Sequence, residues 1–258
     1  MNHLFTAIGR ALARYLDRPL RGYEPFAISD PAKLLATLRP ADVLLIEGNH
    51  RVSTAIKYLT QSTWSHAALF VGDFQKTGLG VEAPALIEAD MEHGVIAVPL
   101  TKYANLNTRI CGPVGLSDDE RRRVCDYAIA RLGHGYDLRH VFDLARYLLP
   151  VPPVPVRWRR RMLALGSGEP TRAICSTLIA QAFQSVRYPI LPRIERRIEE
   201  QGSDYTVREI LHIRHYSLFT PRDFDISPYF RVIKPAVENG FDHRSLLWSD
   251  SPHDLKPG

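Results

Sequence analysis

Three residues that lie far apart along the chain could together form a nucleophilic active site. Cys175, in AICSTLIAQAF, stands at the expected start of an apolar helix. Free amide N–H groups and the helix dipole favour a thiolate there, and the same donors can hold a developing oxyanion. His66, in TWSHAALFVG, heads an apolar strand, so its ring can face a cleft while the strand behind it is buried. A thiolate beside an imidazole indicates nucleophilic catalysis by cysteine.

Glu88, in ALIEAD, is interpreted as the carboxylate that orients His66. It lies on the next expected strand, where a carboxylate can accept the second imidazole N–H and fix the tautomer. Asp90 and Glu92 share its strand face by alternation, so either could take this role instead. Each residue also has a plain structural interpretation: His66 as a hydrogen-bonded structural side chain, and Cys175 as a small buried hydrophobe.

The scaffold that must position these residues is predicted from hydrophobic periodicity and from helix caps. Ser117 and Glu120 form the pattern of a capping box, and Cys125 in the helix that follows is interpreted as a core thiol. Strands that follow one another closely favour an antiparallel sheet. The predicted strands cover 42–48, 66–72, 85–90 and 95–100, and the predicted helices cover 31–38, 52–60, 117–133, 141–149, 175–186 and part of 190–215.

The bulk composition is that of a soluble globular protein, with 45% apolar and 24% charged residues among 258. Three cysteines are too few for the disulfide framework of small secreted domains, which indicates a reducing compartment or a free thiol. No apolar run reaches the roughly 18 residues needed to cross a bilayer. The predicted location is cytoplasmic, or peripheral on the inner face of the membrane.

One main domain is expected at residues 21–237, because no break in composition divides it. Residues 1–20 are expected to form an amphipathic helix, with apolar side chains on one broad face and the arginines largely off it. Residues 238–258 are polar and are interpreted as a loose tail. A basic, proline-rich insert occupies residues 150–162 within the domain.

These segments together resemble the circularly permuted papain-like hydrolases of the NlpC superfamily, in particular the YiiX and YaeF type. The order of histidine, acid and then cysteine is the reverse of that in papain. The resemblance covers roughly residues 38–234. Its most specific pieces are STWSH and CSTLIAQAF, and the others are DVLLIEG, LIEAD, GHGYDL and TPRDFDISPYF.

The resemblance implies an α+β fold of permuted papain-like (NlpC) type, in which a small antiparallel sheet packs against helices that include the nucleophile helix. It implies Cys175 as the nucleophile, His66 as the base and Glu88 as the orienting acid. The cysteine would attack a carbonyl carbon while the histidine carries the proton. No cofactor takes part in such a reaction.

Positions beside the three central residues complete the expected site. Tyr136, in GHGYDL, matches a family position close to the site, and Ser65 and Trp64 stand directly before the histidine. Two features depart from the family pattern. Ala41 stands where the family usually has glycine before the first strand, which indicates a small change in a turn. A long basic stretch also separates GHGYDL from the cysteine, and it could alter what reaches the cleft.

That basic stretch, the insert at 150–162, is the most distinctive feature of the chain. Its apolar start leads into Arg157, Trp158, Arg159, Arg160 and Arg161. A tryptophan among arginines is typical of a membrane interface, where the ring sits at headgroup depth and guanidinium groups bind phosphate. Together with the basic N-terminal helix, the insert predicts an anionic membrane surface as a partner at the rim of the site. The alternatives are a surface loop packed on the domain for the insert and a helix docked on the domain for residues 1–20. No recognised nucleic-acid-binding fold surrounds it, so no nucleic acid is expected.

The predicted function is hydrolysis of an amide or peptide bond through a Cys-His-Glu triad and a thioester intermediate. The runner-up is a lipid-directed thiol acyltransferase or lipase at a membrane surface, because the related lecithin–retinol acyltransferase group uses a similar permuted site. The substrate is accordingly a small amide, a peptide or an acyl lipid. A non-catalytic binding module is the third hypothesis, and the presence of all three polar residues argues against it. No metal is expected, because no histidine pair has a cysteine or carboxylate partner at recognised zinc spacing.

Overall fold

The computed structural model describes residues 25, 30–72, 85–90, 93–134, 174–201, 204–238 and 240–245. Several predictions fall outside these residues: the N-terminal helix at 1–20, the helix at 141–149, the insert at 150–162, Tyr136 and most of the polar tail. The proposed domain boundaries therefore stay predictions.

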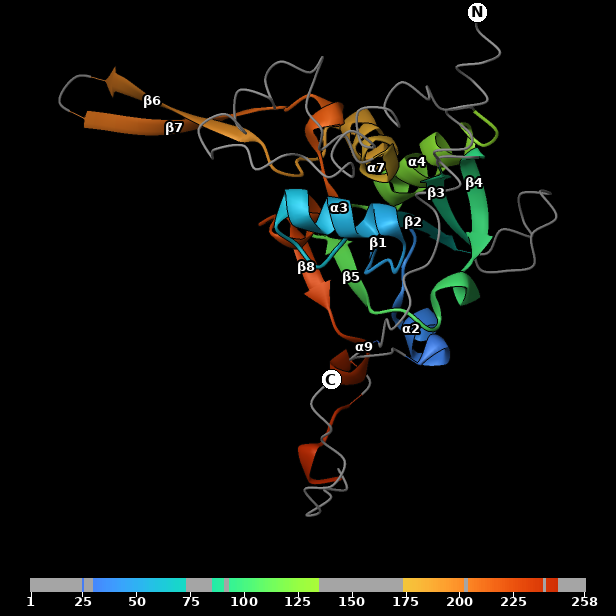
Figure 1. Cartoon of the computed structure of the whole chain (residues 1–258). Helices are drawn as coiled ribbons and strands as arrows, with labels where there is room; N and C mark the ends of the chain where they lie inside the picture. The colour runs from blue at the N-terminus through green and yellow to red at the C-terminus, as the bar shows by residue number, and fades with distance from the viewer. Residues whose placement is uncertain are drawn as a thin grey trace, which may run out of the picture.

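The centre of the fold is a six-stranded antiparallel sheet with strand order β4-β3-β2-β1-β5-β8 (Figure 1). Pairing of β1 with β2 sets Ile46 opposite His66, and pairing of β3 with β4 sets Glu88 opposite Ile96. Four of these strands were predicted, while β5 and β8 were not, so the sheet is wider than expected. The strands are β1 (Val43–Ile46), β2 (His66–Gly72), β3 (Ala85–Asp90), β4 (Gly94–Pro99), β5 (Thr108–Pro113) and β8 (Phe230–Ile233).

Alternation along the strands gives the sheet two buried faces. In β1, Leu45 points into one apolar core and Leu44 into the other. The first core is completed by α4 and α7, which pack on each other, and α7 also lies against β2 and β3. The second core is covered by α2 and the 3-10 helix η2. These helices are α2 (Pro31–Thr37), η2 (Leu100–Tyr103), α4 (Asp118–Ile129) and α7 (Ile174–Ser185).

Side-chain caps explain where several helices begin. The Ser117 hydroxyl accepts the N–H of Glu120, whose carboxylate accepts the N–H of Ser117, so the predicted capping box of α4 is confirmed. At the start of α8, the Asp223 carboxylate accepts both the N–H and the hydroxyl of Thr220. The other helical elements of the described residues are α3 (Arg51–Thr60), η3 (Tyr216–Leu218), α8 (Pro221–Asp225), α9 (Pro235–Glu238) and η4 (His243–Ser245).

The segment 190–215 forms a β-hairpin, so the prediction of a helix there was wrong. β6 (Arg193–Gln201) pairs with β7 (Asp204–His212), and the hairpin projects away from the sheet (Figure 1). Ile194 lies opposite Leu211, and Ile198 lies opposite Val207. Cross-strand pairing stabilises a hairpin, and this stabilisation depends on a second strand that a local hydrophobic pattern does not reveal.

The departure at Ala41 has a visible backbone consequence. Ala41 has φ of 68°, in the left-handed region that costs a residue other than glycine about 1–2 kcal/mol. This strain is a physical reason for glycine at such a position. The Ala41 methyl group is fully buried in the first core, which offsets part of the cost. The Ala41 N–H still donates to the Phe70 carbonyl at 2.8 Å, so the turn itself keeps its place on the sheet.

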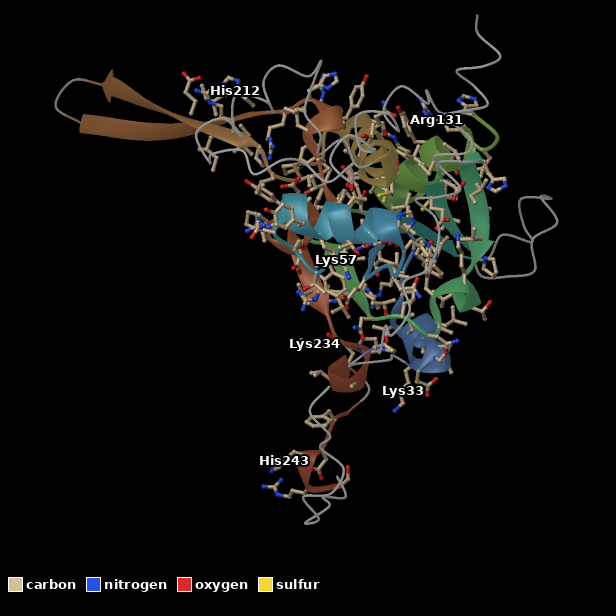
Figure 2. All side chains as sticks on the ribbon, viewed as in Figure 1. Lys33, Lys57, Arg131, His212, Lys234 and His243 are labelled. Atoms are coloured by element: carbon tan, nitrogen blue, oxygen red, sulfur yellow. The ribbon has the colours of Figure 1, made fainter. Side chains whose placement is uncertain are left out.

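Positive charge is distributed over separate elements of the described part. Figure 2 shows Lys33 on α2, Lys57 on α3, Arg131 after α4 and Lys234 after β8. Lys57 pairs with Glu47 at 3.1 Å. Among the described helices none is both long enough and apolar enough to span a membrane.

Candidate functional site

Cys175 is the second residue of α7, and its side chain is almost fully buried. N–H groups in the first turn of a helix have no intrahelical acceptor, so this position favours negative charge on the sulfur. The thiol contacts the His66 ring, the backbone N–H of Ala67 and the hydroxyl of Ser176, which lies 4.0 Å from the sulfur. The cysteine therefore lies where the start of α7 meets the start of β2.

His66 is the first residue of β2 and links the cysteine to a carboxylate. Its Nε2 atom lies 3.1 Å from Oε2 of Glu88. Because Nε2 faces Glu88, Nδ1 is the nitrogen left for Cys175. The His66 side chain is 24% exposed, whereas that of Glu88 is only 2% exposed. The structure thus brings the three predicted residues together in the order thiol, imidazole, carboxylate.

Glu88 is held by two further residues that the sequence analysis did not identify. The Lys102 ammonium lies 2.6 Å from Oε1 of Glu88, and the Tyr103 hydroxyl donates to Oε2. Both residues belong to η2, the short 3-10 helix that follows β4. The tilted rings of Tyr103 and His66 also lie near each other, with centroids 6.0 Å apart. Three donors therefore fix a buried carboxylate that would otherwise be costly to desolvate.

Charges in this cluster shift the pKa values of Cys175, His66 and Glu88 in the directions that favour their ionised forms. Burial raises the pKa of Cys175, but the charge of His66 and the neighbouring donors outweigh it and hold that pKa below its usual range. Burial lowers the pKa of His66, but the charges of Cys175 and Glu88 outweigh it and raise that pKa to about 10. Burial raises the pKa of Glu88, but His66 and Lys102 outweigh it and lower that pKa to about 2. Neutral pH therefore favours thiolate, imidazolium and carboxylate.

The other two cysteines have the opposite electrostatic environment. Cys111 on β5 and Cys125 on α4 are both buried in the first core. Burial raises the pKa of Cys125 to about 12 and raises the pKa of Cys111 further above its usual range. The expectation that Cys125 is a core thiol is confirmed. Within the described residues, Cys175 is thus the cysteine whose surroundings favour a thiolate.

Ser65 and Trp64 fix the backbone directly before His66. The Ser65 hydroxyl accepts the N–H of Gly48 at 2.9 Å, and a Cβ at Gly48 would lie within 2.9 Å of that oxygen. The Trp64 indole N–H donates to Asp225 at 3.0 Å, and Arg109 lies over the Trp64 ring while pairing with the same carboxylate at 2.6 Å. Both predicted near-site residues are therefore anchored to other elements.

The two acidic residues on β3, Glu88 and Asp90, have different partners in the structure. Glu88 contacts His66, whereas Asp90 accepts the His93 N–H at 2.8 Å within the turn between β3 and β4. Of the two, Glu88 is therefore in position to orient the histidine. Glu92 lies outside the described residues, and so do the rest of the predicted site and rim: Tyr136, Arg157, Trp158, Arg159, Arg160 and Arg161.

A thiol at a helix start, paired with a histidine on an antiparallel sheet, places this chain in the class of papain-like cysteine hydrolases. The family described as "Permuted papain-like amidase enzyme, YaeF/YiiX, C92 family" has a model that matches residues 37–147. This match bears out the resemblance to the YaeF/YiiX type over these residues, and with it the fold class and the enzyme class predicted from the sequence. The matched segment contains His66 and Glu88 and ends before Cys175.

Among solved structures, the chain is similar to the metalloprotein yiiX from Escherichia coli O157:H7. The identity is 14%, the TM-score is 0.46, and the match covers 76% of this chain and 96% of that one. No curated protein sequence matches this chain. Among the residues that the structure describes here, no group of three His, Cys, Asp or Glu side chains is placed to hold a metal ion. The expected absence of a metal stays a prediction.

The Tyr103–Glu88 contact predicts a measurable effect on turnover. Tyr103→Phe removes one hydrogen bond to the buried carboxylate while keeping the ring, and hydrogen bonds to charged groups are worth about 1.5–3 kcal/mol. We expect turnover to fall about tenfold or more, because the carboxylate then holds the imidazole less firmly. The matched control is Tyr58→Phe, at a position that is 66% exposed. Equal turnover by the Tyr103 and Tyr58 variants would show that the hydroxyl has no positioning role.

Proposed function

We propose that this protein hydrolyses an amide or peptide bond, with Cys175 as nucleophile, His66 as acid and base, and Glu88 as the group that orients His66. The observation that carries the proposal is that His66 contacts the thiol while its Nε2 atom lies 3.1 Å from a buried carboxylate. A histidine held on both sides in this way keeps one tautomer and one orientation. Small amides and peptides are the substrates that fit an amidase family.

The proposed reaction has two halves. In the first, the Cys175 thiolate attacks the carbonyl carbon, and collapse of the tetrahedral adduct breaks the C–N bond. The His66 imidazolium gives its proton to the departing amine, and a thioester remains. In the second half, His66 takes a proton from water as the water attacks the thioester. The carboxylic acid product leaves, and the thiolate and imidazolium are restored.

The developing oxyanion needs donors, and two sources lie next to the sulfur. The backbone N–H of Ala67 already donates to the Cys175 sulfur. The first-turn N–H groups of α7 have no acceptor within their own helix. Donors that are fixed before the reaction can stabilise an oxyanion without reorganising, and each is worth about 3–4 kcal/mol in comparable sites.

A substrate panel tests the proposed reaction. Purified protein is given N-acyl amides, short peptides, acyl thioesters and phospholipids, and product release is followed by mass spectrometry. The proposal predicts cleavage of an amide or peptide and the transient appearance of an acyl adduct on Cys175. Cleavage of phospholipid esters without cleavage of any amide would instead support the lipid-directed acyltransferase or lipase. Within the described residues no contact favours that alternative, and the anionic membrane partner stays a prediction from the sequence.

A further inference from the structure

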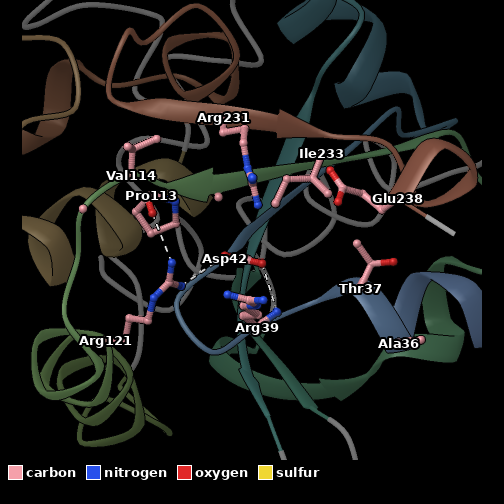
Figure 3. Close-up of a pocket in the computed structure, with 12 residues that line it drawn as sticks. Ala36, Thr37, Arg39, Asp42, Pro113, Val114, Arg121, Arg231, Ile233 and Glu238 are labelled. Carbon is pink, nitrogen blue, oxygen red and sulfur yellow. Dashed lines mark hydrogen bonds and ion pairs between the residues drawn. The ribbon is translucent and has the colours of Figure 1, made fainter. Parts of the chain in front are cut away.

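A polar pocket of about 440 Å³ lies at the opposite end of β1 from His66. Its wall is formed by the end of α2, the end of β5, β8 and a side chain of α4 (Figure 3). Asp42 precedes β1 and Ile46 ends it beside His66, so about 13 Å of extended chain separates the pocket from the site described above. A ligand here would therefore not occupy the proposed catalytic centre.

The floor of this pocket is a satisfied buried ion pair. Arg121 lies 3.2 Å from Asp42, and its guanidinium also donates to the carbonyls of Pro40 and Pro113. The Asp42 side chain is 1% exposed, and its second oxygen accepts the N–H of Arg39. Burial raises the pKa of Asp42, while the charges of Arg121 and Arg39 both act on this carboxylate and oppose that shift.

Two more arginines line the pocket above this floor. Arg39 follows α2, and Arg231 lies on β8 and reaches toward the Asp42 side of the pocket (Figure 3). Neither guanidinium has a hydrogen bond or ion pair to another described residue. The pocket also includes Glu238, an exposed residue at the end of α9. The guanidinium groups of Arg39, Arg121 and Arg231 outnumber the two carboxylates that line the pocket, so the pocket carries excess positive charge.

We propose that this pocket binds a small molecule through its phosphate group, with Arg39 and Arg231 as the two sides of a clamp. A guanidinium presents N–H donors in a planar fork that matches two phosphate oxygens. Two arginines on different elements suit a dianion better than a single carboxylate charge. The volume lies within the usual range for small-molecule sites, which is about 300–1,000 Å³.

Isothermal titration with inorganic phosphate at constant ionic strength tests the clamp. Wild-type protein is expected to bind phosphate saturably and more tightly than acetate. Arg39→Gln and Arg231→Gln should each weaken phosphate binding about tenfold, because each removes a charged hydrogen-bond donor. Arg122→Gln is the matched control, since Arg122 is exposed on the same helix as Arg121 but does not line the pocket.

Three outcomes would overturn the proposal: no saturable binding, equal binding by all four proteins, or a loss in only one of the two pocket variants. Acetate binding as tight as phosphate binding would overturn the phosphate assignment. Arg39 and Arg231 are both exposed, so their replacement should leave the fold intact. The midpoint of thermal unfolding, measured for each variant without phosphate, verifies this.

Discussion

Replacing Cys175 by alanine is expected to reduce amide turnover by roughly 10,000-fold or more. No other described thiol lies beside a histidine, so the thioester route has no substitute nucleophile. In hydrolases with a comparable triad, loss of the nucleophile removes nearly all of the rate contributed by the triad. Steady-state kinetics on the best amide of the panel measures the loss, and intact-protein mass spectrometry should show no acyl adduct.

Cys111→Ala and Cys125→Ala are the matched controls for this variant. Both remove a buried sulfur from the first core, so they test the cost of losing a thiol in the interior without touching the proposed nucleophile. Each is expected to keep turnover near the wild-type value while lowering stability modestly. If Cys175→Ala retained more than a few per cent of wild-type turnover, the nucleophile would have to be assigned elsewhere.

Glu88→Gln is expected to produce the next largest loss, between about 100-fold and 10,000-fold in turnover. A glutamine keeps the size of the side chain but removes the negative charge that favours the imidazolium form of His66. It also presents an NH2 group to a cluster of donors, the Lys102 ammonium and the Tyr103 hydroxyl among them. The histidine would lose both its electrostatic support and a defined orientation.

The pH profile gives a second readout for Glu88. In the wild type, the pKa of His66 is raised to about 10, so the imidazolium needed to protonate the leaving amine is present below that pH and lost above it. Without the carboxylate, the alkaline limb of kcat/KM should move to lower pH. Asp90→Asn is the control on the same strand and should resemble wild type in rate and profile. If the Asp90 variant were inactive while the Glu88 variant kept full activity, the orienting role would have to be assigned to Asp90.

Much of the site could be predicted because its residues stand at the ends of strongly patterned elements. His66 heads a continuous apolar strand, and Cys175 opens an apolar helix, so local pattern made both residues candidates, and the order and spacing of the family motifs selected them. Glu88 could be placed on the neighbouring strand, but its burial and its contact with His66 are what distinguish it from Asp90, and both depend on tertiary packing. The sequence therefore limited the orienting acid to a few positions without choosing among them.

Lys102 and Tyr103 were not predicted as site residues, for a different reason. They follow β4 in a 3-10 turn, and only the chain reversal after β4 brings them over Glu88. Strand β5 was missed because TRICGP mixes a charge, a glycine and a proline with few apolar residues, and it is stabilised by β1 and β8 on its two sides. The β6–β7 hairpin was missed because its stability lies in pairs across two strands. Contacts that are distant in sequence decided each of these elements.

The pH dependence of Cys175 alkylation tests the central claim most directly. Iodoacetamide labelling is followed from pH 4 to 10 with mapping by mass spectrometry, and the midpoint of the profile is used because burial slows the reaction at every pH. An activated thiolate paired with His66 predicts a midpoint well below that of an ordinary thiol, which is about 8.5, with Cys111 and Cys125 unlabelled. In His66→Asn, the midpoint should rise toward the ordinary value. A midpoint at or above about 8.5 in the wild type, unchanged in the His66 variant, would contradict the account.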